Sequence, residues 1–392
     1  MKINNENGVK GIFLVIFCIS IFLFTRSNGY NILPFSNNIM LYLYSVIGSI
    51  VILYLSTSRI KLKAIDILCL VYFIYNLLWL LVTSKTKNIE TIYLFFFLAM
   101  LYINIRNISS IYYKYILYSF PFIVISHFIY YICWENPYYF LYEHKGVFTG
   151  FLHNSGLWGE FVAMTLICNI GLIHLNKKSK KTSTLLIFVS FIVSFMLYES
   201  DSRASWLSFA IGILTFFSPL IIKHLPKSII IRTGSLLILI CLCTYLISGL
   251  YSYKKDSADG RILIWKISLE MVKDKPILGY GFDGFRKNYM NYQAAYLQEK
   301  QLPETINNLA DDNHHAFNEF LRIIIEQGII GVIILFIFLT TIGYTIYKYK
   351  LYIDTVSRTI ISCLTALLFF SFFSYPLSTF HINALIVILL AG

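Results

Sequence analysis

The sequence predicts an all-α membrane protein that crosses the bilayer many times. Of its 392 residues, 57% are hydrophobic and only 13% are charged, and the mean hydropathy is +0.68. A soluble domain of this size carries about a quarter charged residues. Apolar runs of spanning length recur along the whole chain, so we expect a single polytopic membrane domain over residues 1–392.

About twelve transmembrane helices are expected from these apolar runs and the polar loops between them. Their limits are 11–25, 39–56, 64–83, 89–104, 115–133, 157–175, 184–199, 206–222, 229–250, 318–347, 359–374 and 380–392. The first run is expected to be a span and not a signal peptide, because it lacks a small-residue cleavage site and more spans follow. The run near Asn318 is expected to begin as a helix outside the bilayer.

Lys and Arg residues predict the orientation, because short cytoplasmic loops carry an excess of them. The basic loops contain Arg59, Lys61, Lys63, Arg106, Lys114, Lys177, Lys178, Lys180, Lys181, Lys223, Lys227, Arg232, Lys348, Lys350 and Arg358. Both termini are therefore expected in the cytoplasm. The Arg203 loop and a large polar loop over residues 251–317 are expected on the outer face. The net charge of +12 follows from this topology and does not indicate nucleic-acid binding.

Two patterns that resemble known sites are set aside. The seven cysteines lie in or beside apolar segments and form no C-x-x-C pair, so neither a disulfide framework nor a zinc site is expected. Residues Gly279 to Gly284 spell G-x-G-x-x-G, but a dinucleotide site requires a βαβ unit. In an outer loop, glycine turns near a re-entry to the bilayer are the better interpretation.

Two arginines are candidates for binding an anion. Arg203 opens a span, where it could anchor in lipid headgroups, pair with Glu199 or Asp201, or hold a phosphate. Arg261 precedes an apolar stretch with Trp265 that has no clean helical stripe, and we expect a helix on the membrane surface there. Its guanidinium is either a surface cation or a two-pronged ligand for a diphosphate.

The densest polar cluster is Asp311-Asp312-Asn313-His314-His315. It could be a metal site, a capped surface turn, or the location of a general base, since a neutral histidine accepts a proton near neutral pH. In a helix starting there, His315, Asn318 and Glu319 would share a face. Two ionisable residues within apolar runs, His127 and Glu160, have either a functional role or a role in interhelical hydrogen bonds.

In order and topology, these segments resemble the O-antigen ligase/polymerase superfamily of bacterial glycan enzymes. The matching pieces are Ser202 to Leu207, Gly260-Arg261 with Trp265, Pro276 to Phe285, His315 to Leu321 continuing through Glu326 to Gly331, and the earlier segment Gly146 to Glu160. The resemblance covers about residues 146–345. One position departs from it, because many members have a histidine directly before the asparagine, where this chain has Phe317.

The resemblance implies a GT-C-like glycosyltransferase in the bacterial inner membrane, with its active site facing the periplasm. Its donor would be a glycan on undecaprenyl pyrophosphate, and transfer would invert the anomeric centre without metal or other cofactor. Arg203 and Arg261 would bind the pyrophosphate. His315 would be the base, with His314 as the alternative, and Asn318 and Glu319 would support the site.

Three molecules are candidates for supplying the acceptor hydroxyl. We favour a repeat-unit polymerase for O-antigen, capsule or exopolysaccharide, which acts on a second lipid-linked glycan and has a chain-length regulator as a candidate partner. A ligase would use lipid A–core, and a protein O-oligosaccharyltransferase would use a protein side chain. A flippase for lipid-linked glycans is the rival from another class, and it predicts ionisable residues along a midplane pathway.

Overall fold

A computed structural model describes residues 64–83, 89–106, 113–135, 148–152, 154–224, 228, 244–245, 248–300 and 303–392. The predicted spans 11–25 and 39–56, and most of 229–250, lie outside these residues. Within the described ranges every regular element is a helix, which confirms an all-α membrane protein. The total of twelve spans and the GT-C type stay predictions.

Six described helices are long and apolar enough to cross a membrane. They are α3 (Ala64–Thr83), α5 (Tyr113–Tyr130, continued by a π-turn over Tyr131–Glu135), α6 (Ser155–Leu175), α7 (Lys180–Glu199), α8 (Arg203–Lys223) and α13 (Glu319–Lys348). Three others, α4 (Ile89–Arg106), α14 (Thr355–Phe370) and α15 (Phe380–Ala391), are apolar over shorter lengths. All nine fall on runs that the sequence predicts, with ends shifted by a few residues.

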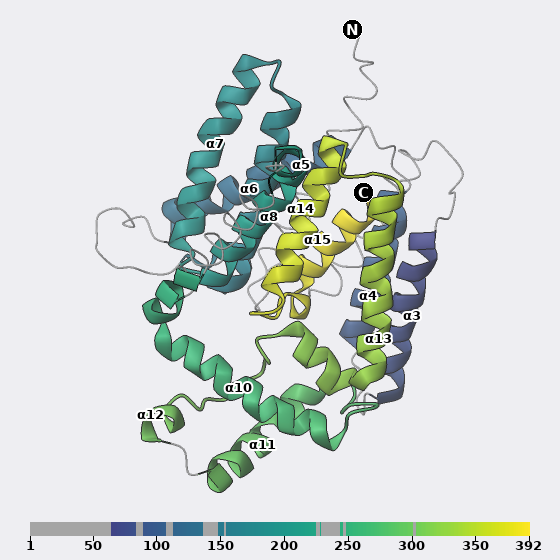
Figure 1. The fold of residues 1–392 in the computed structure, drawn as a ribbon, viewed down its shortest axis with the longest axis vertical. Helices are drawn as coiled ribbons and strands as arrows, with labels where there is room; N and C mark the ends of the chain where they lie inside the picture. The colour runs from purple at the N-terminus through teal and green to yellow at the C-terminus, as the bar shows by residue number, and fades with distance from the viewer. Residues whose placement is uncertain are drawn as a thin grey trace.

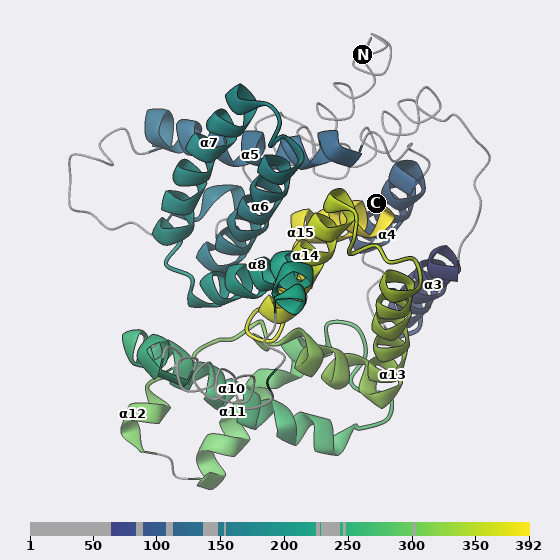
Figure 2. The ribbon, with the colours of Figure 1, turned by 45° about the horizontal axis from the view of Figure 1, so that its top comes forward.

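Helix α6 forms the centre of the bundle (Figures 1 and 2). It is almost wholly buried among α5, α7, α8 and α14, with Trp158 and Phe161 fully enclosed. Small residues allow this close packing, as at Gly212 of α8, where a Cβ atom would lie 2.3 Å from Ile167 Cδ1. Such contacts hold membrane helices together where lipid removes the hydrophobic driving force.

A second layer lies beyond one end of the spans and consists of α10 (Lys255–Asp274), α11 (Gly284–Lys300) and the short α12 (Glu304–Asn307) (Figure 1). The predicted polar loop 251–317 is therefore largely helical. The expectation that α10 lacks an apolar stripe is wrong, since Leu263, Ile267 and Met271 follow one another at i, i+4 and i+8 and are buried. Their face packs against α11 and the start of α13 inside the protein.

Helix α13 is kinked at Gly328, where φ is +64°. The turn between α10 and α11 fits into this kink, because Ile329 N donates to Pro276 O at 2.9 Å and Tyr280 N donates to Ile325 O at 2.8 Å. Gly279 has φ +65°, and a Cβ atom there would lie 2.5 Å from Ile325 O. Gly279 and Gly281, both at positive φ, are thus turn residues as expected, whereas Gly284 begins helix α11.

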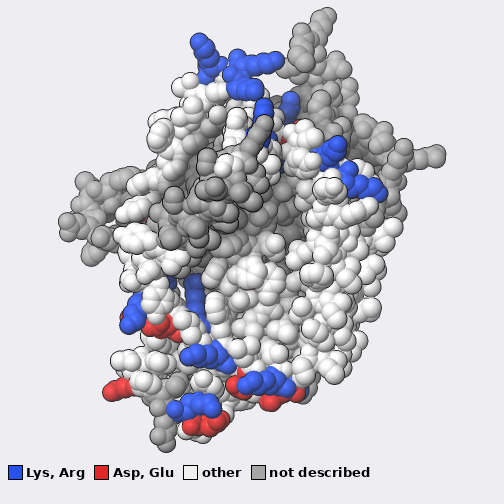
Figure 3. Space-filling model, in the orientation of Figure 1, with Lys and Arg blue, Asp and Glu red and all other residues white. Residues whose placement is uncertain are grey.

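Charge is distributed unevenly between the two ends of the molecule (Figure 3). Basic side chains dominate the end where α7 begins and α13 finishes, which includes Lys180, Lys181, Lys348 and Lys350. At the opposite end, the α10–α12 layer carries acidic and basic side chains together. The basic end is the one that the sequence predicts to be cytoplasmic.

Candidate active site

Three candidate residues, Arg203, Arg261 and His315, lie where the α10–α12 layer meets the bundle. Arg203 is the first residue of α8, and Ser202 caps that helix by accepting from Ser205 N. The guanidinium of Arg203 donates to the carbonyls of Leu250 and Tyr251, at 2.5 and 3.4 Å. Asp201, a partner considered for Arg203, instead forms an ion pair with Lys254 at 2.6 Å.

Arg261 projects from the first half of α10. Its Nη1 donates to Phe373 O at 2.8 Å, and its guanidinium lies 5.2 Å from the centre of the Phe317 ring. Burial lowers the pKa of Arg261 to about 10, and the positive charge of Arg203 acts in the same direction. Among the described residues, no carboxylate forms a salt bridge with either arginine. Two mutually repelling cations that form no salt bridge make a site that favours an anion, although the Asp201 carboxylate acts on Arg203 through space.

His315 lies just before α13 and stacks on Tyr375, with ring centroids 3.8 Å apart and planes 8° from parallel. Tyr375 is fixed in turn, because its hydroxyl accepts from Asn154 Nδ2 at 2.8 Å. Burial, followed by the positive charge of Arg322, lowers the pKa of His315 to about 4. The imidazole is therefore neutral at pH 7 and has one nitrogen that can accept a proton.

His314 has a different environment. Its side chain is half exposed, and Nε2 lies 3.8 Å from Asp312 Oδ2. The structure brings His315, and not His314, into contact with the aromatic cluster beside Arg261. Within the described residues, no group of three His, Cys, Asp or Glu side chains is arranged to hold a metal ion.

The expectation that His315, Asn318 and Glu319 share a helix face is wrong. The helix begins only at Glu319, and Asn318 is its extended N-cap, with Oδ1 accepting from Leu321 N at 3.0 Å. Phe317 has φ +49°, which reverses the chain before the cap. An asparagine side chain that accepts from a backbone N–H three residues later caps the helix, so the helix begins directly after the asparagine.

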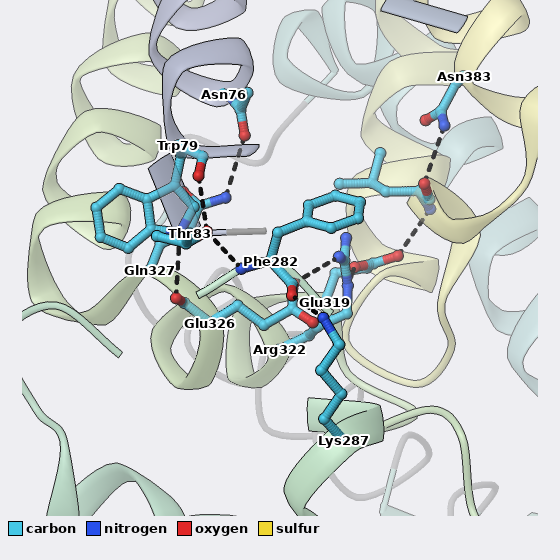
Figure 4. A network of polar contacts seen from close by, with 11 residues as sticks. Asn76, Trp79, Thr83, Phe282, Lys287, Glu319, Arg322, Glu326, Gln327 and Asn383 are labelled. Carbon is cyan, nitrogen blue, oxygen red and sulfur yellow. Dashed lines mark hydrogen bonds and ion pairs between the residues drawn. The ribbon is translucent and has the colours of Figure 1, made fainter. Parts of the chain in front are cut away.

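Glu319 connects the start of α13 to the turn that carries Tyr375 (Figure 4). Its buried carboxylate accepts from Arg322 Nε at 2.6 Å and from Leu377 N at 2.7 Å, and its backbone N–H donates to Ser371 O at 2.9 Å. Glu319 therefore joins the two segments that carry the stacked rings of His315 and Tyr375.

The sequence interpretation missed Tyr375 and Asn154. Tyr375 stands beside Pro376 in a short break between two apolar runs, and an aromatic residue there has no distinctive local signal. Asn154 lies within the segment Gly146 to Glu160 and serves as the N-cap of α6. Only the fold places Tyr375 on His315 and Asn154 on Tyr375.

The other two ionisable candidates make contacts between helices. Glu160 is fully buried in α6 and accepts a hydrogen bond from Ser208 Oγ of α8. His127 of α5 packs against the rings of Phe151 and Trp158. The Glu160 contact agrees with the interhelical hydrogen-bond alternative, whereas the contacts of His127 with these two rings are ring packing.

The fold and the site define a class: an all-α membrane protein with an anion-attracting site at one end of its bundle. Comparison with known proteins shows what part of the chain is similar to. Residues 188–336 match the family model described as O-Antigen ligase. This segment contains Arg203, Arg261 and His315.

Curated relatives agree with this match. A putative polysaccharide ligase of Rickettsia conorii is 30% identical over 223 residues, covering 54% of this chain and 50% of the relative. A second, from Rickettsia typhi, is 32% identical over 193 residues, covering 47% and 44%. An uncharacterized protein of Haemophilus influenzae is 28% identical over 193 residues, covering 44% and 46%.

The chain thus spans about half the length of the curated relatives it matches. The matched segment is similar to the O-antigen ligase family, which confirms the resemblance expected from the sequence.

Proposed function

We propose that this protein is a membrane glycosyltransferase that moves a glycan en bloc from undecaprenyl pyrophosphate to an acceptor hydroxyl at the outer face of the bacterial inner membrane. The observation that carries the proposal is the pairing of a neutral histidine with two arginines that form no salt bridge within the described residues. Arg203 and Arg261 lie close enough for the charge of one to lower the pKa of the other, and the Phe317 ring that faces Arg261 shares Tyr375 with His315.

The arginines suit the diphosphate of the donor. Each now donates to neutral backbone carbonyls, of Phe373 for Arg261 and of Leu250 for Arg203. A diphosphate oxygen is a stronger acceptor, because hydrogen bonds between two charged groups are about twice as strong as neutral ones. The same two guanidiniums would stabilise the diphosphate as it leaves with the electron pair of the glycosidic C–O bond.

His315 suits the role of general base. Its neutral ring accepts the proton of the acceptor hydroxyl while the oxygen attacks the anomeric carbon from the face opposite the diphosphate, which inverts that centre. A pKa of about 4 makes His315 a weak base in the empty site. The negative charge of a bound diphosphate raises this pKa toward the working pH, so the donor itself would activate the base.

The acceptor defines the activity. We place a polymerase first, with a second lipid-linked repeat unit as acceptor and a chain-length regulator as a candidate partner. The alternative is a ligase with lipid A–core as acceptor. The description of the family model and the names of the relatives fit this ligase as well as they fit a polymerase. A protein hydroxyl is the third acceptor. A flippase is disfavoured by the concentration of the described charged site residues at one end of the bundle.

The experiment is deletion of the gene, followed by separation of surface glycans and lipid-linked intermediates on gels. Complementation with wild type, Arg261→Lys and His315→Ala tests the site, and His314→Ala is the matched control. A ladder that collapses to one capped repeat identifies a polymerase. Full-length polymer retained on undecaprenyl pyrophosphate identifies a ligase or protein transferase. If deletion leaves both profiles unchanged, the proposed function is wrong.

A further inference from the structure

The turn Pro276–Leu278, between α10 and α11, presents two apolar side chains outward. Ile277 is 63% exposed and Leu278 is 56% exposed. The backbone beneath them is fixed in the kink of α13, because Ile329 N donates to Pro276 O at 2.9 Å. A Cβ atom on Gly328 would lie only 2.0 Å from Ile277 O. The turn is thus held firmly in a position that exposes both side chains.

The length of α13 locates the membrane boundary at this turn. Its 30 residues correspond to about 45 Å at 1.5 Å per residue, which exceeds the roughly 30 Å of a bilayer's hydrocarbon core. Residues 329–348 alone supply about 30 Å. The charged side chains Glu319, Arg322 and Glu326 all lie before the kink. The outer edge of the hydrocarbon core therefore falls near Gly328.

Helix α3 ends at the same level (Figure 4). Thr83, its last residue, accepts from Phe282 N at 2.9 Å, and Trp79 Nε1 donates to Glu326 O at 3.3 Å. Tryptophan is enriched at membrane–water interfaces, because its ring is apolar and its N–H is polar. Two spans and the turn thus meet at one interface.

The exposed residues around the turn have the character of a lipid-facing surface. Ile329 and Ile333 of α13 are 43% and 51% exposed, and Val82 at the end of α3 is 79% exposed. Ile277 and Leu278 extend this apolar surface outward. Two exposed lysines precede them in the chain: Lys273, which pairs with Glu270, and Lys275, whose Nζ lies over the Tyr280 ring.

We propose that Ile277 and Leu278 insert into the outer leaflet and anchor the α10–α11 layer to the membrane. The partner of this surface is the lipid bilayer itself. The anchor fixes the far end of α10, while the Lys254–Asp201 ion pair holds its near end against the bundle. If the proposed function holds, this sets the height of Arg261 relative to the diphosphate of a membrane-bound donor.

A genetically encoded, environment-sensitive fluorescent amino acid at position 278 tests the anchor in the full-length protein in lipid nanodiscs. Position 336 on α13, where Phe336 is 67% exposed, is the lipid-facing control. Position 299 on α11, where the Glu299 side chain is 72% exposed, is the aqueous control. We expect blue-shifted emission at 278, quenched by lipids with a shallow nitroxide and protected from iodide.

Quenching at 278 by iodide, as at 299, would overturn the proposal. Protection from both quenchers would also overturn it, because a protein would then cover the turn. The fluorescence measurement needs no enzymatic turnover. If the protein transfers no glycan, the proposed function is refuted, and the anchor is still tested by the fluorescence.

A paired substitution tests the consequence for the site. Ile277→Ser with Leu278→Ser removes the apolar side chains and keeps the backbone that fits the kink. We expect a severalfold higher KM for the lipid-linked donor with little change in kcat. The control is Leu269→Ser with Met290→Ser, which changes two other exposed apolar residues of α10 and α11. An equal effect in both pairs would contradict a specific role of the anchor in donor binding.

Discussion

Two histidines of the candidate site are adjacent in the sequence but have different surroundings. His315 is stacked on Tyr375 near Arg261, and His314 is half exposed beside Asp312. A base must be held in one orientation to take a proton from a positioned hydroxyl. The environment of His315 provides that orientation, and the environment of His314 does not.

We expect His315→Ala to lower glycan transfer by about 10²–10⁴-fold, the usual contribution of a positioned general base. His314→Ala should change it by less than about twofold, since surface substitutions are usually near neutral. Transfer by purified protein from a lipid-linked donor measures both. Equal losses in the two variants would refute the assignment.

The pH dependence follows from the lowered pKa of His315. In the free protein the ring stays neutral down to a pH of about 4, because burial and Arg322 disfavour its protonated form. We therefore expect kcat/KM, which reports the free enzyme, to keep its value between pH 7 and 5 and to fall only as the pH approaches 4. A fall centred near 6.5, the pKa of an ordinary histidine, would show that the ring is not buried as described.

At the scale of elements, the site depends on how α13 begins and bends. Asn318 caps the helix and sends the preceding chain toward Trp265, whose Nε1 donates to Ala316 O at 3.0 Å. The kink at Gly328 then receives the turn that follows α10. One helix thus positions both His315 and the layer that carries Arg261.

Gly328→Ala should destabilise the protein, and Gly343→Ala should not. Gly328 has φ +64° and no space for a Cβ atom, whereas a Cβ atom on Gly343 of the same helix meets nothing within 4 Å. Alanine at a positive φ costs more than about 1 kcal/mol. Thermal unfolding in detergent measures the difference. Similar midpoints for the two variants would mean that the kink is not fixed by glycine.

Glu319 tests the link between the two halves of the site. Glu319→Ala leaves Leu377 N without its acceptor and Arg322 with only Glu326 as a partner. We expect a loss of about 1–3 kcal/mol in stability, the cost of an unsatisfied buried group. Glu319→Gln retains an acceptor for Leu377 and should lose less. The measurement is the unfolding midpoint, which we expect to fall in the order wild type, Glu319→Gln, Glu319→Ala.

At the scale of the whole molecule, a wide bundle around α6 supports a helical layer at one end, with the site between them (Figures 1 and 2). The uneven charge distribution gives the molecule a direction in the membrane, because basic loops stay in the cytoplasm. The site would then face the periplasm, where a lipid-linked donor is presented.

Cysteine accessibility checks this orientation. In a cysteine-free variant, a cysteine at the exposed Glu299 of α11 should react with a membrane-impermeant reagent in cells with a permeabilised outer membrane. A cysteine at the exposed Lys181 of α7 should react only after the inner membrane is opened. The reverse pattern would place the layer in the cytoplasm and exclude a periplasmic donor.

The sequence by itself determined the membrane class, the helical runs, and the residues Arg203, Arg261 and His315 as candidates. These are local properties, since hydropathy over a span and a charged residue at its edge need no distant partner. Only the tertiary structure decided that α10 buries its apolar face against α11, that Asn318 ends any helix before it, and that Tyr375 meets both His315 and Asn154. Asn154 and Tyr375 lie 221 positions apart, and the packing of α6 against α14 determines that contact.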